Sequence, residues 1–168
     1  MTSGHSDEVD KIVSAWREQR PDLDSRPMLI FSRVSRLARH LDLSRRTAFM
    51  ENGLDTWEFD VLSVLRRAGK PYVMTPGALM TELLVSSGTM TNRIDRLEAK
   101  NLVKRVPSPT DRRAVLVTLT KEGQTRVDAA LETLLAEEEQ LLAGFGEDDR
   151  ARLAELLRPL LLNFEAND

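Results

Sequence analysis

The fold of this chain is decided by residues 75–120, which read TPGALMTELLVSSGTMTNRIDRLEAKNLVKRVPSPTDRRAVLVTLT. Helix-start residues open a short helix at 75–77, and a second helix is predicted over residues 86–101. Two apolar or β-branched runs follow, at 102–106 and 114–119, and a Pro-Ser-Pro-Thr turn separates them. The order helix, turn, helix, strand, loop, strand predicts a helix-turn-helix followed by a β-hairpin wing, which is a DNA-reading device.

The second helix of this unit has two distinct faces. Met90, Ile94 and Leu97 recur at helical spacing and are expected to face the core, while Ser86 or Ser87 caps the helix. The other positions carry small hydrogen-bonding side chains and then cations, which can approach base edges and phosphates closely. An ordinary solvated amphipathic helix is the alternative interpretation of this stretch alone. The candidate DNA-binding residues of the helix are Ser86, Ser87, Thr89, Thr91, Asn92, Arg93 and Arg96.

The loop between the two predicted strands carries Arg112 and Arg113. Asp111 lies two residues before Arg113 and can hold its guanidinium by a charge-assisted hydrogen bond. In a hairpin arm, both arginines are expected to reach a minor groove or a phosphate. A solvated turn is the alternative, but the preceding helix pair favours the DNA-binding interpretation.

The charge is distributed unevenly along the chain. The 168 residues carry 24 Lys or Arg and 27 Asp or Glu, so the formal net charge is −3. Residues 86–113 carry seven cations and three acids and amount to +4, residues 114–168 amount to −7, and residues 1–85 are neutral. Positive charge is therefore concentrated on the predicted DNA-reading element, where attraction to phosphates requires it.

Other classes of function are disfavoured by what the sequence lacks. It has no cysteine, which excludes disulfides, thiolate metal sites and cysteine redox chemistry. It has no Gly-rich phosphate loop, metal-spaced histidine cluster or nucleophile motif, so neither an enzyme nor a bound cofactor or metal is expected. His5 and His40 are isolated in the sequence. No apolar run is long enough to span a bilayer and residues 1–10 lack a signal-peptide core, so we expect a cytoplasmic location without membrane contact.

The rest of the chain is expected to be helical, so the fold class is mainly α with a small β-hairpin. We expect N-terminal helices for dimerisation and sensing in residues 1–52, the winged helix-turn-helix in 53–120, and C-terminal dimerisation helices in 121–168. The last two helices carry more leucine than a small monomer would expose, which favours a homodimer. A closed bundle within one chain is the alternative.

Some details of the scaffold are also predicted. Residues 1–7 are expected to be frayed, and a first helix is expected over 8–20. Ser25 is expected to cap a second helix that runs to about Met50. Leu84 is expected to pack within the helix-turn-helix, and Thr120 is expected to cap a long helix that runs through Leu142. Three arginines of the second helix, Arg33, Arg36 and Arg39, are expected on a solvated face. Its inward-facing residues are expected to be Leu29, Ile30, Phe31, Val34, Leu37, Ala38 and Leu41.

One carboxylate has apolar neighbours. Asp60 lies in the run WEFDVL at 57–62, so it is expected to be half-buried and to need a partner. The residues alone favour a structural ion pair between Asp60 and an arginine. They likewise favour a packing role for Trp16 on the first helix.

Two motifs resemble those of the MarR family of winged-helix transcription regulators. Residues 87–98, SGTMTNRIDRLE, are similar to the family's recognition helix, and residues 111–123, DRRAVLVTLTKEG, are similar to its wing. The resemblance covers roughly residues 25–164. It implies a homodimeric, ligand-responsive repressor that binds a pseudopalindromic operator in double-stranded DNA. The oxidation-sensing branch of the family uses a cysteine, and this chain has none.

The chain further resembles a urate-responsive branch of this family that has an added N-terminal helix. The residues that match this branch's ligand site are Trp16, Asp60, Arg93 and Arg105. An indole can stack on a flat heterocycle, and guanidinium groups can neutralise its charge. Bound anion would then shift the recognition helix and lower its affinity for DNA. Related regulators respond to other anions, including citrate-like acids, so the small anionic or aromatic effector stays open.

Two functions therefore remain from the sequence. The first is a ligand-responsive DNA-binding regulator. The second is a helical dimerisation module that binds protein without sequence-specific DNA binding, and it predicts that Arg112 and Arg113 are dispensable. The sequence leaves open the operator, the regulated genes, and repression as opposed to activation.

Overall fold

The computed structural model describes residues 6–109, 111 and 114–165, and it is mainly helical with one small antiparallel sheet. The predicted fold class is confirmed. The chain divides after Thr47 into two compact units, so helix α2 begins in the first unit and ends in the second. The helices are α1 (Glu8–Gln19), α2 (Met28–Glu51), α3 (Thr56–Arg67), α4 (Pro76–Leu83), α5 (Ser87–Ala99), α6 (Lys121–Leu141) and α7 (Glu147–Glu165). The strands are β1 (Val73–Met74), β2 (Val103–Pro107) and β3 (Val115–Leu119).

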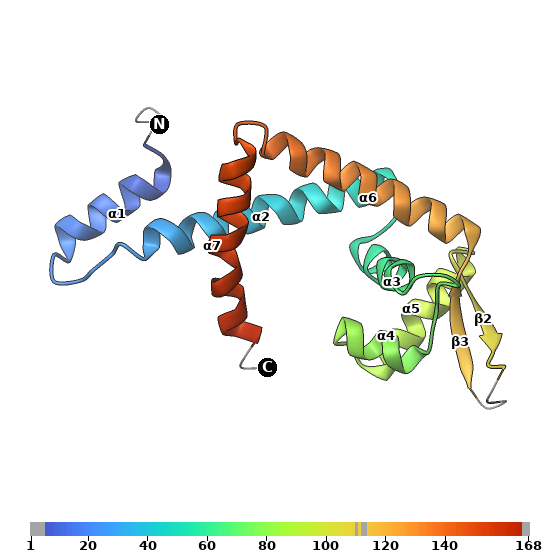
Figure 1. Cartoon of the computed structure of the whole chain (residues 1–168). Helices are drawn as coiled ribbons and strands as arrows, with labels where there is room; N and C mark the ends of the chain where they lie inside the picture. Colours follow the sequence, from blue (N-terminus) through green and yellow to red (C-terminus); the bar gives the residue numbers. More distant parts are fainter. Residues whose placement is uncertain (1–5, 110, 112–113, 166–168) are drawn as a thin grey trace. The chain divides into compact units, whose positions relative to one another are not determined.

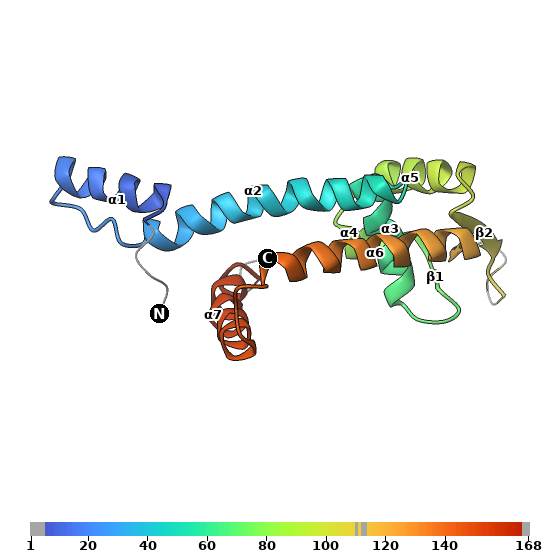
Figure 2. The ribbon, with the colours of Figure 1, turned by 90° about the horizontal axis from the view of Figure 1, so that it is seen from above.

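The N-terminal unit pairs α1 with the first part of α2 through charged side chains (Figure 2). Asp7 and Asp10 form a capping box at the start of α1, so the expectation of a frayed start is wrong for Asp7. The Arg33 guanidinium contacts Asp7 at 2.7 Å and Asp10 at 2.8 Å. Arg36 contacts Glu8 at 2.7 Å. Two of the arginines that were expected on a solvated face therefore hold the acidic end of α1.

Helix α2 leaves most of its apolar side chains uncovered, which corrects the expected inward face. Ile30 is 54% exposed and Leu37 is 59% exposed, and only Ala48 and Phe49 of this helix are buried. The physical reason is that α1 is half as long as α2 and covers one side of it. The expected cap is also corrected. The Ser25 hydroxyl is buried without a hydrogen-bond partner in the described part of the chain, and it is the Ser25 carbonyl that accepts from the Met28 N–H at 3.1 Å.

The second unit contains the predicted helix-turn-helix and wing (Figure 1). The sheet has the order β1-β3-β2, and Arg105 of β2 lies opposite Val117 of β3. The hairpin of β2 and β3 was predicted. The third strand was not, because β1 has only two residues, in which Val73 pairs with Thr118. The short strand ties the segment between α3 and α4 to the wing.

The core of this unit lies beneath the helix-turn-helix. Met90, Ile94 and Leu97 are buried, which confirms the predicted inner face of α5. Phe49 and Phe59 stack with ring centroids 3.9 Å apart, which joins the end of α2 to α3. Leu84 corrects a prediction: it is 91% exposed, because it adopts a left-handed conformation (φ 50°) as the C-cap of α4.

Helix α6 starts against the wing, and α7 follows it. The Thr120 hydroxyl caps α6 by accepting from the Gly123 N–H at 2.9 Å, as the sequence predicts. Gly123 packs so closely on the Leu102 carbonyl that a Cβ there would overlap it. No residue of α7 within the described part of the helix is buried. None of the helices in the described ranges combines the length and apolar character needed to cross a lipid bilayer.

Candidate nucleic-acid interface

The first half of α5 presents small polar side chains to solvent. Ser86 is the N-cap, and its hydroxyl accepts from the Thr89 N–H at 3.3 Å and pairs with the Thr89 hydroxyl at 2.9 Å. Thr91 donates its hydroxyl to the Ser87 carbonyl at 2.9 Å. The Ser87 hydroxyl and the Asn92 amide are exposed and form no hydrogen bond with any described residue. These two groups are therefore available to an external partner, and Ser87 lies at the end of a helix that attracts anions.

Two arginines of α5 lie over one aromatic ring of α3. The guanidinium carbon of Arg96 is 4.8 Å from the Trp57 ring centroid, and that of Arg93 is 5.7 Å away. Cation–π contacts at such distances favour one orientation of each guanidinium. Arg96 also lies 3.9 Å from the Asp55 carboxylate, in an exposed pair. Trp57 therefore supports the cationic side of the recognition helix, a role that its apolar spacing did not reveal.

An ion pair between a buried carboxylate and a partly exposed ammonium fixes the end of the same helix. Glu58 has no exposed surface, and its Oε1 is 2.6 Å from the Lys100 ammonium. The other Glu58 oxygen accepts from the Asp55 N–H at 3.0 Å at the start of α3. The sequence directed attention to Asp60, which is half-buried as predicted, and missed Glu58. The available signal was the Asp55-Thr-Trp-Glu58 spacing, which is typical of a capping box.

Arg105 connects α5 to the wing sheet. Its guanidinium contacts Glu98 and Asp95, and its backbone N–H donates to Glu98 at 2.9 Å. The Arg105 backbone N–H and guanidinium lower the pKa of Glu98 below its ordinary value. The hydrogen bond that the Asp95 carboxylate accepts from the Arg105 guanidinium raises the pKa of Arg105. The recognition helix and β2 are thus joined by charge-assisted hydrogen bonds.

The wing residues that carry the other DNA prediction, Arg112 and Arg113, lie outside the described residues. The flanking backbone forms a turn in which the Asp111 N–H donates to the Ser108 hydroxyl at 3.2 Å. The Ser108 N–H donates to the Ala114 carbonyl at 3.0 Å, which closes the hairpin below the loop.

The four predicted ligand residues are divided between the two units. Trp16 is on α1, 49% exposed, and borders a pocket of about 320 Å³ together with Ser25 and Met28. Asp60 on α3, Arg93 on α5 and Arg105 on β2 belong to the second unit. Within that unit, Arg93 contacts Trp57 and Arg105 is paired with two carboxylates.

A helix-turn-helix followed by a wing sheet, with an exposed polar and cationic helix, defines a winged-helix DNA-binding protein. The MarR family model matches residues 52–114. The transcriptional regulator PecS of Dickeya dadantii is 37% identical over 150 residues, which cover 89% of this chain and 90% of PecS. The chain belongs to the MarR family, and it is a transcription regulator.

Solved structures agree with this assignment. A mutant MarR from E. coli complexed with operator DNA has a TM-score of 0.59 at 28% identity, and the match covers 83% of this chain and 99% of that one. YusO from Bacillus subtilis shares the fold, with a TM-score of 0.69 at 22% identity. The match covers 83% of this chain and 99% of the YusO chain. Membership of a family of regulators bears out the expectation that the protein is not an enzyme.

Proposed function

We propose that this regulator is a homodimeric repressor that binds a pseudopalindromic operator and is released from it by a small anionic ligand. The observation that carries the DNA-binding part is the exposed face of α5, where unpaired polar groups of Ser87 and Asn92 precede two arginines supported by Trp57. Polar groups at the start of such a helix suit base edges, and cations suit phosphates. That an E. coli relative was solved with operator DNA supports the same use of the fold.

The proposed dimer is supported by the uncovered apolar surface of α2 and α7. Leu156 is 62% exposed, Leu161 60% and Phe164 68%. Their spacing places these three side chains in one apolar stripe along α7. Such a stripe is unfavourable in water and is covered when a symmetry mate supplies the same stripe. A twofold axis would then present two α5 helices to successive major grooves, about 34 Å apart. In this proposal residues 1–52 serve dimerisation and sensing, residues 53–120 bind DNA, and residues 121–168 serve dimerisation.

The proposed effector site uses Trp16, Asp60, Arg93 and Arg105. Arg93 belongs to the recognition helix itself, so an anion that binds it acts on the DNA-reading element without an intermediary. Arg105 is already paired with Asp95 and Glu98 of α5, and an anion that competes for its guanidinium would loosen α5 from β2. The effector must bind the dimer released from DNA more tightly than the bound dimer. Urate is the first candidate, and other purines, citrate-like acids and aromatic acids remain candidates.

The proposal is tested by competition. Operator duplex is bound to the protein and titrated with urate, xanthine, citrate and aromatic acids, and the fraction of bound DNA is measured. We expect one anion of the panel to release the DNA. Arg93→Ala should blunt that release, and its DNA affinity without ligand is measured alongside. Full release from the Arg93→Ala protein would remove this residue from the site.

Fluorescence gives an independent measurement of the effector site. In a Trp57→Phe background, Trp16 is the only remaining tryptophan. Quenching of its emission by the active anion, with no quenching by inactive members of the panel, is expected. Unchanged emission at saturating anion would exclude contact with Trp16.

A further inference from the structure

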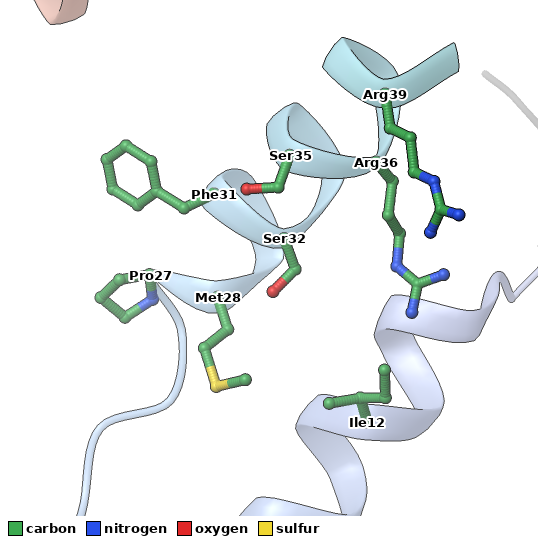
Figure 3. A pocket seen from close by; sticks show the side chains of 8 residues that line it. All are labelled: Ile12, Pro27, Met28, Phe31, Ser32, Ser35, Arg36 and Arg39. Carbon is green, nitrogen blue, oxygen red and sulfur yellow. The ribbon is translucent and has the colours of Figure 1, made fainter. Parts of the chain in front are cut away.

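A second pocket lies within the N-terminal unit, between α1 and the first part of α2 (Figure 3). It is a shallow depression of about 710 Å³ that is open to solvent, and a small organic molecule fits along it. Ile12 is the residue of α1 that lines this pocket. It shares none of the four residues of the proposed effector site.

The pocket is apolar at one end and cationic at the other. Figure 3 shows Met28 and Phe31 at the start of α2 and the guanidinium groups of Arg36 and Arg39 further along the helix, on the side of α1. The hydroxyls of Ser32 and Ser35 lie between the two ends. A molecule that matches this lining has a hydrophobic body and one anionic group.

The two arginines differ in how they are held. Arg36 uses Nη1 to contact Glu8 at 2.7 Å. Arg39 forms no ion pair or hydrogen bond with any described residue, although it lies one helical turn from Arg36. Arg39 has no acidic partner in the described part of the chain, and Arg36 uses only one of its terminal nitrogens to contact Glu8. A carboxylate can therefore be bound by both cations.

The pocket lies on the opposite side of α2 from Ile30 and Val34, which belong to the uncovered apolar surface of α2 that is proposed for dimerisation. At about 100° per residue, Ser32, Ser35 and Arg39 fall within one narrow sector of the helix, and Ile30 and Val34 fall roughly opposite. A second protomer that covers Ile30 and Val34 therefore leaves this sector open. The pocket and the dimer stripe are compatible.

We infer that this pocket binds an organic carboxylate with an extended apolar body, through Arg36 and Arg39 at one end and Met28 and Phe31 at the other. Phe31 and Arg39 are eight residues apart, which is about 12 Å along a helix. That length suits an aliphatic chain of about ten carbons or a fused two-ring aromatic acid. The bound carboxylate competes with Glu8 for Arg36 and weakens one of the ion pairs that hold α1 to α2.

The experiment is isothermal titration calorimetry of the full chain with decanoate, kept below its micelle concentration, and with 2-naphthoate. Decanamide and 2-naphthamide are the neutral controls. We expect at least one of the two acids to bind, and its amide to bind at least tenfold more weakly. If both acids bind, the site accepts aliphatic and aromatic bodies; if one binds, that body is the preferred one.

Variants then assign the binding to this pocket. Arg39→Met should weaken acid binding at least tenfold, and Ser35→Phe, which fills the pocket, should do the same. Arg17→Met removes an exposed cation of α1 outside the pocket and should leave it unchanged. Arg93→Ala separates acid bound at the proposed effector site from acid bound in this pocket. The inference is overturned if neither acid binds, if Arg39→Met binds as well as the unmodified protein, or if Arg93→Ala abolishes binding.

Discussion

At the scale of single residues, the recognition helix depends on two side chains of α3. Trp57 supports the guanidinium groups of Arg93 and Arg96, and Glu58 holds the ammonium of Lys100. All three cations belong to the positive segment that is expected to face phosphates. The helix therefore keeps its cations ordered before DNA arrives, which lowers the entropy lost on binding.

Lys100→Met tests the pair with Glu58. It leaves a buried carboxylate without its cation, and because the Lys100 side chain is itself 43% exposed, the cost should be about 2 kcal/mol, below that of a fully buried pair. We expect the free energy of unfolding, measured by urea denaturation, to fall by about that amount. The double variant Glu58→Gln/Lys100→Met should recover part of the loss. A Lys100→Met protein as stable as the parent would show that the pair contributes nothing.

Asp7 gives a prediction on pH. The hydrogen bond from Arg33 lowers the pKa of Asp7 from 3.8 to about 2. Because the folded pKa is the lower one, the contact stabilises the docked α1 above pH 4 and its contribution is lost as pH falls toward 2. Carboxyl carbon NMR should give a pKa near 2 for Asp7, and Arg33→Met should raise it toward its ordinary value, with the backbone hydrogen bond from Asp10 still lowering it. An Asp7 pKa near 4 in the parent protein would contradict the docking of α1.

At the scale of elements, most helix boundaries could be predicted from local sequence signals. Thr75, Ser86 and Thr120 cap the helices that they were expected to cap, because a hydroxyl at an N-cap satisfies a backbone N–H wherever it occurs. Strand β1 was missed because two residues form no alternating pattern, and pairing with β3 alone makes it a strand. Leu84 was misplaced because its left-handed backbone turns the side chain away from the core.

Gly123 tests the junction between α6 and the wing. A Cβ at this position would overlap the Leu102 carbonyl, so Gly123→Ala must push α6 away from the start of β2. Overpacking of this kind costs about 1–3 kcal/mol, and the urea midpoint should fall accordingly. Gly144→Ala is the matched control, because a Cβ there meets no atom within 4 Å. Equal stability of the two variants would show that the junction is loosely packed.

At the scale of the whole molecule, the largest difference from the sequence prediction is the exposure of the leucines of α2 and α7, which were expected to be covered. The sequence identified the apolar stripes of α2 and α7, but periodicity does not say whether the covering surface belongs to the same chain or to another. The candidate site was predicted only in part for a similar reason. Exposed polar residues of α5 follow from its pattern, whereas Glu58 and Trp57 owe their roles to contacts between elements.

Leu157→Glu tests the dimer. Each of the two copies of the stripe loses about 2 kcal/mol of apolar burial, so the dimer dissociation constant should rise about a thousandfold. Analytical ultracentrifugation measures it. Ala151→Glu adds the same charge on the other side of α7 and should leave the dimer intact. A parent protein that is monomeric at high concentration would overturn the proposed dimer.

The most direct test of the central claim is the salt dependence of DNA affinity, measured with the tightest-binding duplex from a random pool. The Arg93 and Arg96 pairs of a dimer supply four cations, so the slope of log affinity against log salt should be about −3.5 or steeper. Arg96→Met should make that slope shallower by about 2, since one contact is lost in each protomer. A slope near zero, or one that Arg96→Met leaves unchanged, would contradict the assignment of α5 as the DNA-binding helix.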